Sequence, residues 1–216
     1  MIIEKFEYFN TDHLVERLRK MHIKGRPDLT IYRDARITLE EDYPIEQVVF
    51  PQYYVLEKDL EEITLCRRAL MEYGVDIFRL RGFVRVWSRR QDNGQMQVFD
   101  VTPPVVEISQ ADGGIPLLND GMHRLYLARQ ESPAMNLVIV EGVDPRYPYY
   151  ALPNEGGWDS LQRCREVPDI KKNYRIADYK SLFRDFNTCF LNVTQPRTTK
   201  KIDRIKVQGQ QVAQGR

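Results

Sequence analysis

The chain lacks long apolar runs, paired cysteines and an excess of either charge. No apolar run approaches the ~20 residues that span a bilayer, and the first five residues contain no leader-like apolar segment. No Cys-x-x-Cys pair occurs, so neither a zinc knuckle nor a dithiol redox centre is indicated. Isolated cysteines are typical of a reducing compartment. We therefore expect a soluble, cytoplasmic protein with no membrane partner; its three cysteines are Cys66, Cys164 and Cys189.

The charge of the chain is balanced overall, with 32 Lys and Arg against 31 Asp and Glu. This balance does not by itself indicate a polyanionic partner. The charges are unevenly placed, however, because residues 40–46 are acidic and residues 197–216 carry six cations against one aspartate. The basic end is either a solvated tail or a segment that contacts nucleic acid.

The apolar pattern predicts an α/β fold of the α+β type, with a mixed sheet and flanking helices. The hydrophobic fraction of 42% is sufficient for a packed core. A short helix is expected near the N-terminus, where Thr11 or Asp12 can cap it. Residues 56–73 form the clearest helical stripe and are followed by Gly74. A further helical stretch is expected at residues 180–186.

Strands are expected where apolar and β-branched runs are bounded by turn residues. Two pairs of these strands are predicted hairpins, because Asn93-Gly94 and Gly113-Gly114 are typical of tight turns. A strand, a helix and another strand in succession indicate a mixed sheet. The expected strands are residues 48–55, 83–88, 96–101, 105–109, 115–118 and 137–140.

Composition divides the chain into three parts. Residues 1–47 are expected to pack on the core as an N-terminal segment, and residues 48–144 to form the central domain. Residues 145–216 are expected to be a C-terminal extension, which starts with a loop rich in proline and tyrosine and ends in the basic tail.

The feature that indicates chemistry is Asn119-Asp120-Gly121-Met122-His123-Arg124, within the predicted strand-turn-helix at residues 118–128. Asp120 is suited to cap the helix, and Gly121 lets the main chain turn tightly and approach a ligand. The first N–H groups of a helix have no partner within it, and the helix dipole is positive at this end. The sequence therefore predicts an anion site here.

Two side chains strengthen this prediction. Arg124 adds a permanently charged planar group that binds phosphate oxygens in pairs. His123 adds a second donor and is placed to move protons near neutral pH, whereas we interpret His13 and His22 as structural. The alternative is that Asp120 is merely a cap, His123 a satisfied residue and Arg124 an ion-pair partner.

This motif and its surroundings resemble the ParB/sulfiredoxin superfamily. Members of that superfamily are generally nucleotide-dependent, and they include chromosome-partition switches, sulfinic-acid reductases, free-serine kinases and proteins proposed to be nucleases. The resemblance implies that residues 48–144 adopt the superfamily fold. It covers about residues 48–140 and rests on the helix at 56–73, residues 104–109, a Gly-Gly turn, and residues 115–128.

The resemblance also implies which residues hold the ligand. Gly121, His123 and Arg124, together with Asn119 and Met122, are expected to bind the phosphates of a nucleoside di- or triphosphate. ATP, ADP and CTP are not distinguished, and Mg²⁺ can accompany the nucleotide. No separate metal-ligand set is predicted.

The chain departs from two branches of the superfamily at this motif. Sulfiredoxin has a cysteine where this chain has Met122, and a thioether cannot act as a thiolate nucleophile, so sulfinic-acid reduction is not expected. Partition proteins have Gly-Glu-Arg-Arg here, and a helix-turn-helix domain follows. In this chain Met122 and His123 replace the Glu and the first Arg, and no helix-turn-helix pattern follows Asp144. The motif is closer to the kinase-like and uncharacterised branches.

The leading hypothesis is an enzyme or switch that binds a nucleotide and transfers or hydrolyses a phosphoryl group, with a small molecule as acceptor. Asp120 would orient the turn or share Mg²⁺, and His123 and Arg124 would neutralise phosphate charge. Glu107 would bind Mg²⁺ or accept a hydroxyl proton. Its alternative role is that of a strand-surface glutamate.

The second hypothesis is a nucleic-acid-binding module or nuclease on the same fold. Phe83, Arg85, Trp87 and Arg89 share one face of a predicted strand and could stack on bases, or the aromatic residues could be core and the arginines solvated. The loop at residues 147–150 either covers a ligand's base or packs on the outside. A third hypothesis is a non-catalytic interaction protein.

Overall fold

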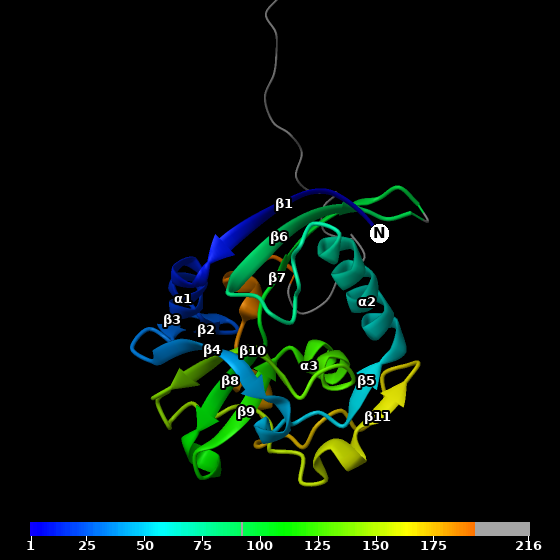
Figure 1. The fold of residues 1–216 in the computed structure, drawn as a ribbon. Coiled ribbons are helices and arrows are strands. Elements are labelled where there is room, and N and C mark those ends of the chain that lie inside the picture. The colour runs from blue at the N-terminus through cyan, green and yellow to red at the C-terminus, as the bar shows by residue number, and fades with distance from the viewer. Residues whose placement is uncertain (92, 193–216) are drawn as a thin grey trace, which may run out of the picture.

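The computed structural model of the chain describes residues 1–91 and 93–192, and its fold is α+β, as the sequence predicts (Figure 1). Its helices are α1 (Thr11–Arg19), α2 (Glu57–Met71) and α3 (Met122–Arg129). Its strands are β1 (Ile2–Asn10), β2 (His22–Ile23), β3 (Arg26–Thr30), β4 (Arg36–Pro44), β5 (Tyr54–Leu56), β6 (Gly82–Arg89), β7 (Met96–Val101), β8 (Val105–Ser109), β9 (Ile115–Asp120), β10 (Ala134–Glu141) and β11 (Gln162–Cys164).

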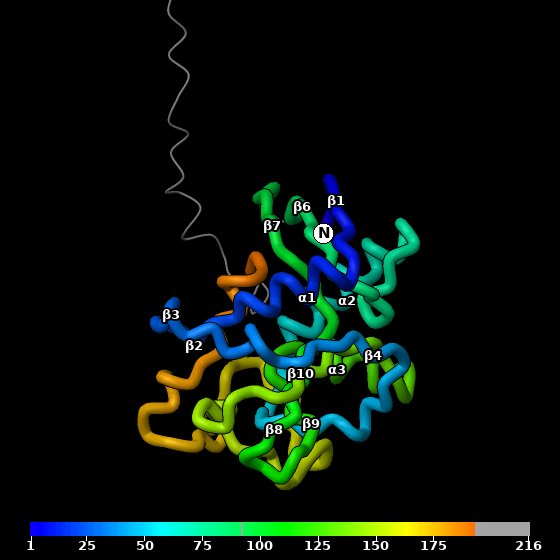
Figure 2. The backbone as a smooth tube through the Cα atoms, turned by 90° about the vertical axis from the view of Figure 1, so that its left-hand side faces the viewer, coloured from blue at the N-terminus to red at the C-terminus, as the bar shows by residue number. Residues whose placement is uncertain are grey.

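Two sheets form the body of the molecule. One is an antiparallel sheet in the order β1-β6-β7, and the other is a mixed sheet in the order β4-β10-β8-β9, in which β10 and β8 are parallel. Figure 1 shows α3 below the three-stranded sheet and beside the four-stranded one, with α2 along one side of the molecule, and Figure 2 shows the three-stranded sheet above the other after a 90° turn. Two small sheets, β2-β3 and β11-β5, lie at the periphery.

Both predicted hairpins are confirmed. β6 pairs with β7 and β8 pairs with β9, and the turns contain Gly94, Gly113 and Gly114, all with positive φ. The N-terminal 47 residues contribute β1 and β4, each a strand of one main sheet. The expected strand at residues 48–55 is shorter than predicted: β5 begins at Tyr54, and before it Val49 makes an isolated bridge to Leu117.

Three local predictions about helices have different outcomes. α1 is confirmed, but its cap is Asn10, whose side chain accepts the His13 N–H at 3.1 Å, so the prediction of Thr11 or Asp12 was wrong. α2 is confirmed and lies within the range 56–73. The helix expected at residues 180–186 was wrong: two 3₁₀ turns, Tyr179–Leu182 and Phe186–Thr188, lie there.

A long-range contact explains why residues 180–186 do not form the predicted helix. Arg184 forms an antiparallel bridge with Ile23, and the main-chain bonds Lys24 N–H to Phe183 O and Asp185 N–H to His22 O fix it at 2.7 and 2.9 Å. These bonds use main-chain groups that a helix would need for its own ladder.

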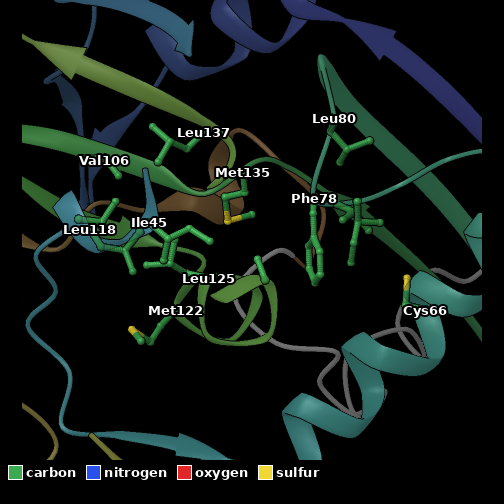
Figure 3. Close-up of a cluster of buried hydrophobic side chains, with 14 of the residues drawn as sticks. Ile45, Cys66, Phe78, Leu80, Val106, Leu118, Met122, Leu125, Met135 and Leu137 are labelled. Carbon is green, nitrogen blue, oxygen red and sulfur yellow. The ribbon is translucent and has the colours of Figure 1, made fainter. Parts of the chain in front are cut away.

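The larger hydrophobic cluster anchors the strand-turn-helix element (Figure 3). Met122 and Leu125 of α3 pack in it beside Leu118 of β9, and Cys66 enters it from α2. Burial of a side chain of this size stabilises the fold by roughly 1.5–3 kcal/mol. The motif's methionine is thus a core residue that fixes the start of α3. No helix within the described ranges is long and apolar enough to cross a membrane.

Candidate functional site

The turn between β9 and α3 is built around Gly121. Its φ is +101°, and a Cβ added there would lie 2.8 Å from Pro104 Cβ and 3.1 Å from Arg124 Nη2. Only glycine combines this backbone conformation with so close an approach. Gly121 is also the N-cap of α3, and no side chain in the described part of the chain caps this helix. The N–H groups of its first turn therefore have no helical partner.

Asp120 has a different role from the one predicted. The prediction that it caps α3 was wrong, because its carboxylate accepts a hydrogen bond from Arg124 Nη2 at 2.6 Å. The two side chains are 12% and 9% exposed, respectively. Arg124 Nε is buried, and it has no hydrogen-bond partner among the residues that the structure places. The arginine is therefore only partly satisfied by its carboxylate.

His123 connects α3 to the start of α2. Its Nε2 accepts the main-chain N–H of Leu56 at 3.0 Å and lies 3.6 Å from Asp59 Oδ2. Burial lowers the pKa of this histidine, against the opposing effect of Asp59. Because Nε2 is an acceptor, the neutral ring carries its proton on Nδ1. In this geometry His123 is a neutral residue that fixes two helices and has one donor left.

A cavity of about 510 Å³ lies beside this turn. All residues from 119 to 124 line it, so every predicted residue of the motif contributes to one wall. The other walls come from α2, from β7 and from the later residues Tyr150 and Lys172. This volume lies within the range of small-molecule sites, roughly 300–1,000 Å³.

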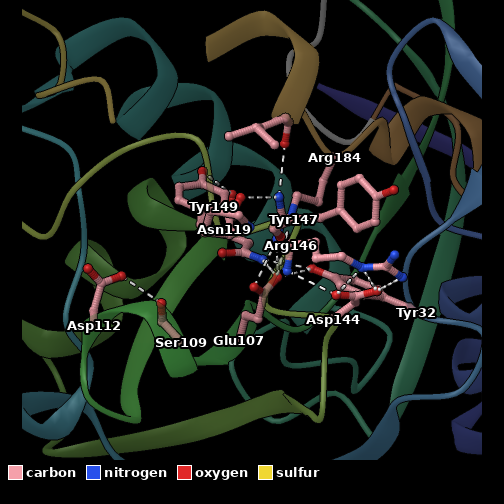
Figure 4. A network of polar contacts seen from close by, with 12 residues as sticks. Tyr32, Glu107, Ser109, Asp112, Asn119, Asp144, Arg146, Tyr147, Tyr149 and Arg184 are labelled. Carbon is pink, nitrogen blue, oxygen red and sulfur yellow. Dashed lines mark hydrogen bonds and ion pairs between the residues drawn. The ribbon is translucent and has the colours of Figure 1, made fainter. Parts of the chain in front are cut away.

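Glu107 lies outside the lining of this cavity, in a buried ion pair with Arg184 (Figure 4). It is 2% exposed, so the alternative of a strand-surface glutamate was wrong. Arg184 Nη2 lies 2.9 Å from Oε1 and 3.0 Å from Oε2, and the Tyr32 hydroxyl donates to Oε2 at 3.1 Å. The carboxylate is neutralised and fully bonded, and this placement does not support its predicted proton-transfer role.

Asn119 links the wall of the cavity to the ion pair of Glu107 and Arg184. Its side-chain Nδ2 donates to Glu107 Oε2 at 2.9 Å and to the Tyr32 hydroxyl at 2.7 Å, which anchors the amide in the ion-pair network. Its main-chain oxygen accepts the Tyr149 hydroxyl at 3.2 Å. Asn119 therefore holds the end of β9 in place, immediately before the turn that lines the cavity.

The tyrosine loop at residues 147–150 contributes to the ion-pair network and to the wall of the cavity. Tyr149 is 1% exposed and packs inside, so the alternative of packing on the outside does not hold for this residue, and burial raises the pKa of its hydroxyl. Tyr150, the next residue, lines the cavity. Which part of a ligand this loop contacts stays a prediction.

The residues proposed for base stacking do share one face of β6. Phe83 is fully buried and stacks on Phe9 with ring centroids 4.4 Å apart. Arg85 forms a two-bond pair with Asp100 at 2.8 and 2.9 Å. Lys5 lies over the Trp87 ring, and Arg89 pairs with Glu4 at 2.8 Å. Cross-strand partners thus occupy this face, while the predicted basic tail lies outside the described residues.

Several cavity residues were not identified from the sequence. Asp59 and Glu62 of α2 line the cavity, and burial raises the pKa of Glu62. Cys66 also lines it, and burial raises the pKa of this thiol to about 12, so it stays protonated. The one signal available for them was the α2 periodicity, which cannot show what faces the helix. Within residues 1–91 and 93–192, no group of three or more His, Cys, Asp or Glu is arranged to hold a metal ion.

The fold and the cavity define an α+β protein with a ligand-sized site at a strand-glycine-helix junction. The family model of the ParB CE domain matches residues 13–162 of the 216-residue chain. Because the match covers more than half of the sequence, the chain belongs to the ParB CE domain family. No curated protein and no solved structure gives a significant match. The ParB side of the sequence resemblance is confirmed, and the matched segment contains the whole motif.

Proposed function

We propose that the cavity binds a nucleoside di- or triphosphate, with a phosphate group at the Gly121 turn. The observation that carries this proposal is that residues 119–124 line one cavity at the uncapped start of α3. Free main-chain donors and the positive end of the helix dipole both favour an anion at such a position. Nucleotide binding would also agree with the superfamily resemblance of the motif.

Arg124 can contact a phosphate without leaving Asp120. A guanidinium group has five N–H donors, and the bond to Asp120 Oδ2 comes from Nη2. Arg124 lines the cavity, so its remaining N–H donors would meet the anion there, and the buried, unpartnered Nε would reach it after a small movement of the side chain. Asp120 would act by orienting the guanidinium, and Gly121 by letting the ligand approach the main chain.

His123 would contribute one donor rather than a charge. Its Nε2 is used by the Leu56 N–H, so a phosphate oxygen would meet Nδ1–H of a neutral ring. Met122 would act through its main-chain N–H, since its side chain is buried in the core.

Phosphoryl transfer or hydrolysis is the more specific version of this proposal. It requires a base for the acceptor hydroxyl, and the carboxylates of Asp59 and Glu62 line the same cavity. Burial raises the pKa of Glu62, so its carboxylate is a stronger base than a solvated glutamate would be. Mg²⁺ would enter with the nucleotide, because carboxylate oxygens are suitable ligands for it.

A panel of nucleotides in a thermal unfolding assay, with and without Mg²⁺, tests the proposal. A ligand at a hundred times its Kd adds about 2.7 kcal/mol to the free energy of unfolding. We expect at least one nucleoside di- or triphosphate to raise Tm, and a small acceptor alone to have no effect. If no nucleotide raises Tm at millimolar concentration, the proposal fails and the non-catalytic interaction protein is favoured.

Nucleic-acid binding or a nuclease activity is the alternative, and the resemblance to proposed nucleases supports it. The arginines first proposed for it are paired, Arg85 with Asp100 and Arg89 with Glu4, so their charge is largely compensated. If the alternative holds, binding of DNA or RNA should weaken steeply as the salt concentration rises. Absence of binding at low salt would exclude this alternative.

A further inference from the structure

We infer that Lys172 binds a second phosphate group in the cavity, so that the site takes ligands with two or three linked phosphates in preference to monophosphates. This inference rests on the proposed function and specifies its ligand class. Lys172 lies beyond residue 162, where the family match ends, so this chain's C-terminal extension would supply part of the site.

The main chain holds Lys172 at the cavity. Residue 172 forms an antiparallel bridge with Gln52, and the Tyr53 N–H donates to Lys171 O at 3.3 Å. Gln52 and Lys172 both line the cavity. The lysine is therefore attached to the segment that leads into β5 and is not on a detached loop.

The charges around the cavity distinguish Lys172 from the two arginines that line it, Arg90 and Arg124. Four carboxylates line the cavity, and three of them are paired with an arginine. The pairs are Asp120 with Arg124 at 2.6 Å, Asp100 with Arg85 at 2.8 Å, and Glu62 with Arg90 at 3.7 Å. The fourth, Asp59, lies 3.6 Å from His123 Nε2.

Lys172 instead donates to neutral groups, the hydroxyls of Tyr150 at 2.5 Å and Tyr149 at 3.4 Å. In the part of the chain that the structure describes, no carboxylate lies within ion-pair distance of it. Its positive charge is thus left for an anion.

The tyrosines also fix where this charge lies. Lys172 Nζ lies 4.7 Å from the ring centroid of Tyr150 and 5.7 Å from that of Tyr149. The Tyr149 hydroxyl donates in turn to the main-chain oxygen of Asn119. One tyrosine therefore connects the ammonium group to the end of β9, just before Gly121.

Two of the positive groups that line the cavity are thus connected to the end of β9. The first is the start of α3 with the buried, unpartnered Nε of Arg124, whose side chain is 9% exposed. The second is Lys172. In the inferred arrangement a single phosphate would contact one of them and a chain of phosphates both, and hydrogen bonds between charged groups are the strong ones.

Calorimetry on the full chain with Lys172→Gln tests this inference. The ligands are a nucleoside monophosphate, the matching triphosphate, and inorganic tripolyphosphate, which contains no base. We expect the variant to weaken triphosphate and tripolyphosphate binding by about tenfold or more, and monophosphate binding by less than about threefold. Lys172→Arg should retain most of the affinity because it keeps the charge.

Lys171→Gln is the matched control, since the neighbouring Lys171 is exposed and should have no effect on affinity. Equal triphosphate affinity of Lys172→Gln and wild type, or an equal loss for mono- and triphosphate, would overturn the inference and leave the proposed function intact. If wild type binds tripolyphosphate but no nucleotide, the proposed function fails, and loss of tripolyphosphate binding in Lys172→Gln still supports the Lys172 site. If wild type binds neither, both fail.

Discussion

Two buried arginine–carboxylate pairs lie near the end of β9, and they differ in how completely they are bonded. Arg184 uses all three nitrogens: Nε and Nη2 donate to Glu107, Nη2 also donates to Tyr147 O, and Nη1 donates to Pro148 O and Leu182 O. Arg124 donates to Asp120 from Nη2, and its buried Nε is unpartnered within the described residues. Both arginine side chains are at least nine-tenths buried.

The difference separates a structural pair from a candidate binding pair. A buried charge needs its partner and further hydrogen bonds to offset desolvation. Arg184 has them, and it fixes the C-terminal segment to β8. Arg124 lacks some of them and lines a cavity, so a ligand can supply the rest. An unsatisfied donor at a cavity, more than the presence of an ion pair, is the reason for proposing ligand binding at Arg124.

The largest predicted effect is on the free energy of unfolding, when the fully bonded pair of Arg184 and Glu107 is broken. Glu107→Ala leaves Arg184 charged, buried and without its carboxylate, which should lower the free energy of unfolding by about 3–5 kcal/mol. Denaturant unfolding measures it. Glu141→Ala is the control, because its pair with Arg36 is largely exposed and should contribute less than about 1 kcal/mol. A loss below about 1 kcal/mol in Glu107→Ala would show that the pair is not essential to the fold.

Gly121→Ala should have the next largest effect. A left-handed backbone costs a non-glycine residue roughly 1–2 kcal/mol, and the clash with Pro104 adds about 1–3 kcal/mol. Gly142→Ala is the matched control, since its φ is +77° but a Cβ would meet nothing within 4 Å. We expect Gly121→Ala to be the more destabilising in thermal unfolding and the one that weakens nucleotide binding. Equal behaviour of the two variants would refute a close approach at Gly121.

A smaller effect should appear in the pH dependence of stability. Burial holds the folded-state pKa of His123 below the ordinary value of about 6.5. The unfolded chain therefore binds a proton first as pH falls below 6.5, and stability is lost by up to about 1.4 kcal/mol per pH unit until the folded-state pKa is reached. His123→Gln should flatten this slope between pH 8 and pH 5. An unchanged slope in the variant would assign the acid sensitivity to other groups.

Local features of the site could be predicted from the sequence. The strand, the Gly121 turn and the helix at residues 118–128 follow from one glycine and a short apolar pattern. The pairing of Asp120 with Arg124 had a signal, the four-residue spacing of opposite charges. The alternative interpretation did make Arg124 an ion-pair partner, but it left the carboxylate unnamed because Asp120 also suits a cap.

Long-range features could not be predicted. Lys172, Glu107 and Arg184 reach their partners across long stretches of sequence, and no local spacing indicates them. Residues 180–186 show the same limit, since pairing with Ile23 replaces the helix that their pattern favours. The fold class could still be predicted, because the succession of strands and helices indicates a mixed sheet without reference to any particular long-range contact.

The most direct test of the account is calorimetric titration of wild type and Arg124→Ala with the nucleotide that raises Tm most. If Arg124 pairs with a buried phosphate, the variant should lose about 2–3 kcal/mol of binding free energy, a loss of more than about tenfold in affinity. Its free energy of unfolding without ligand should be measured in parallel to show that it folds. Unchanged nucleotide affinity in a folded Arg124→Ala protein would contradict the assignment of the phosphate to this turn.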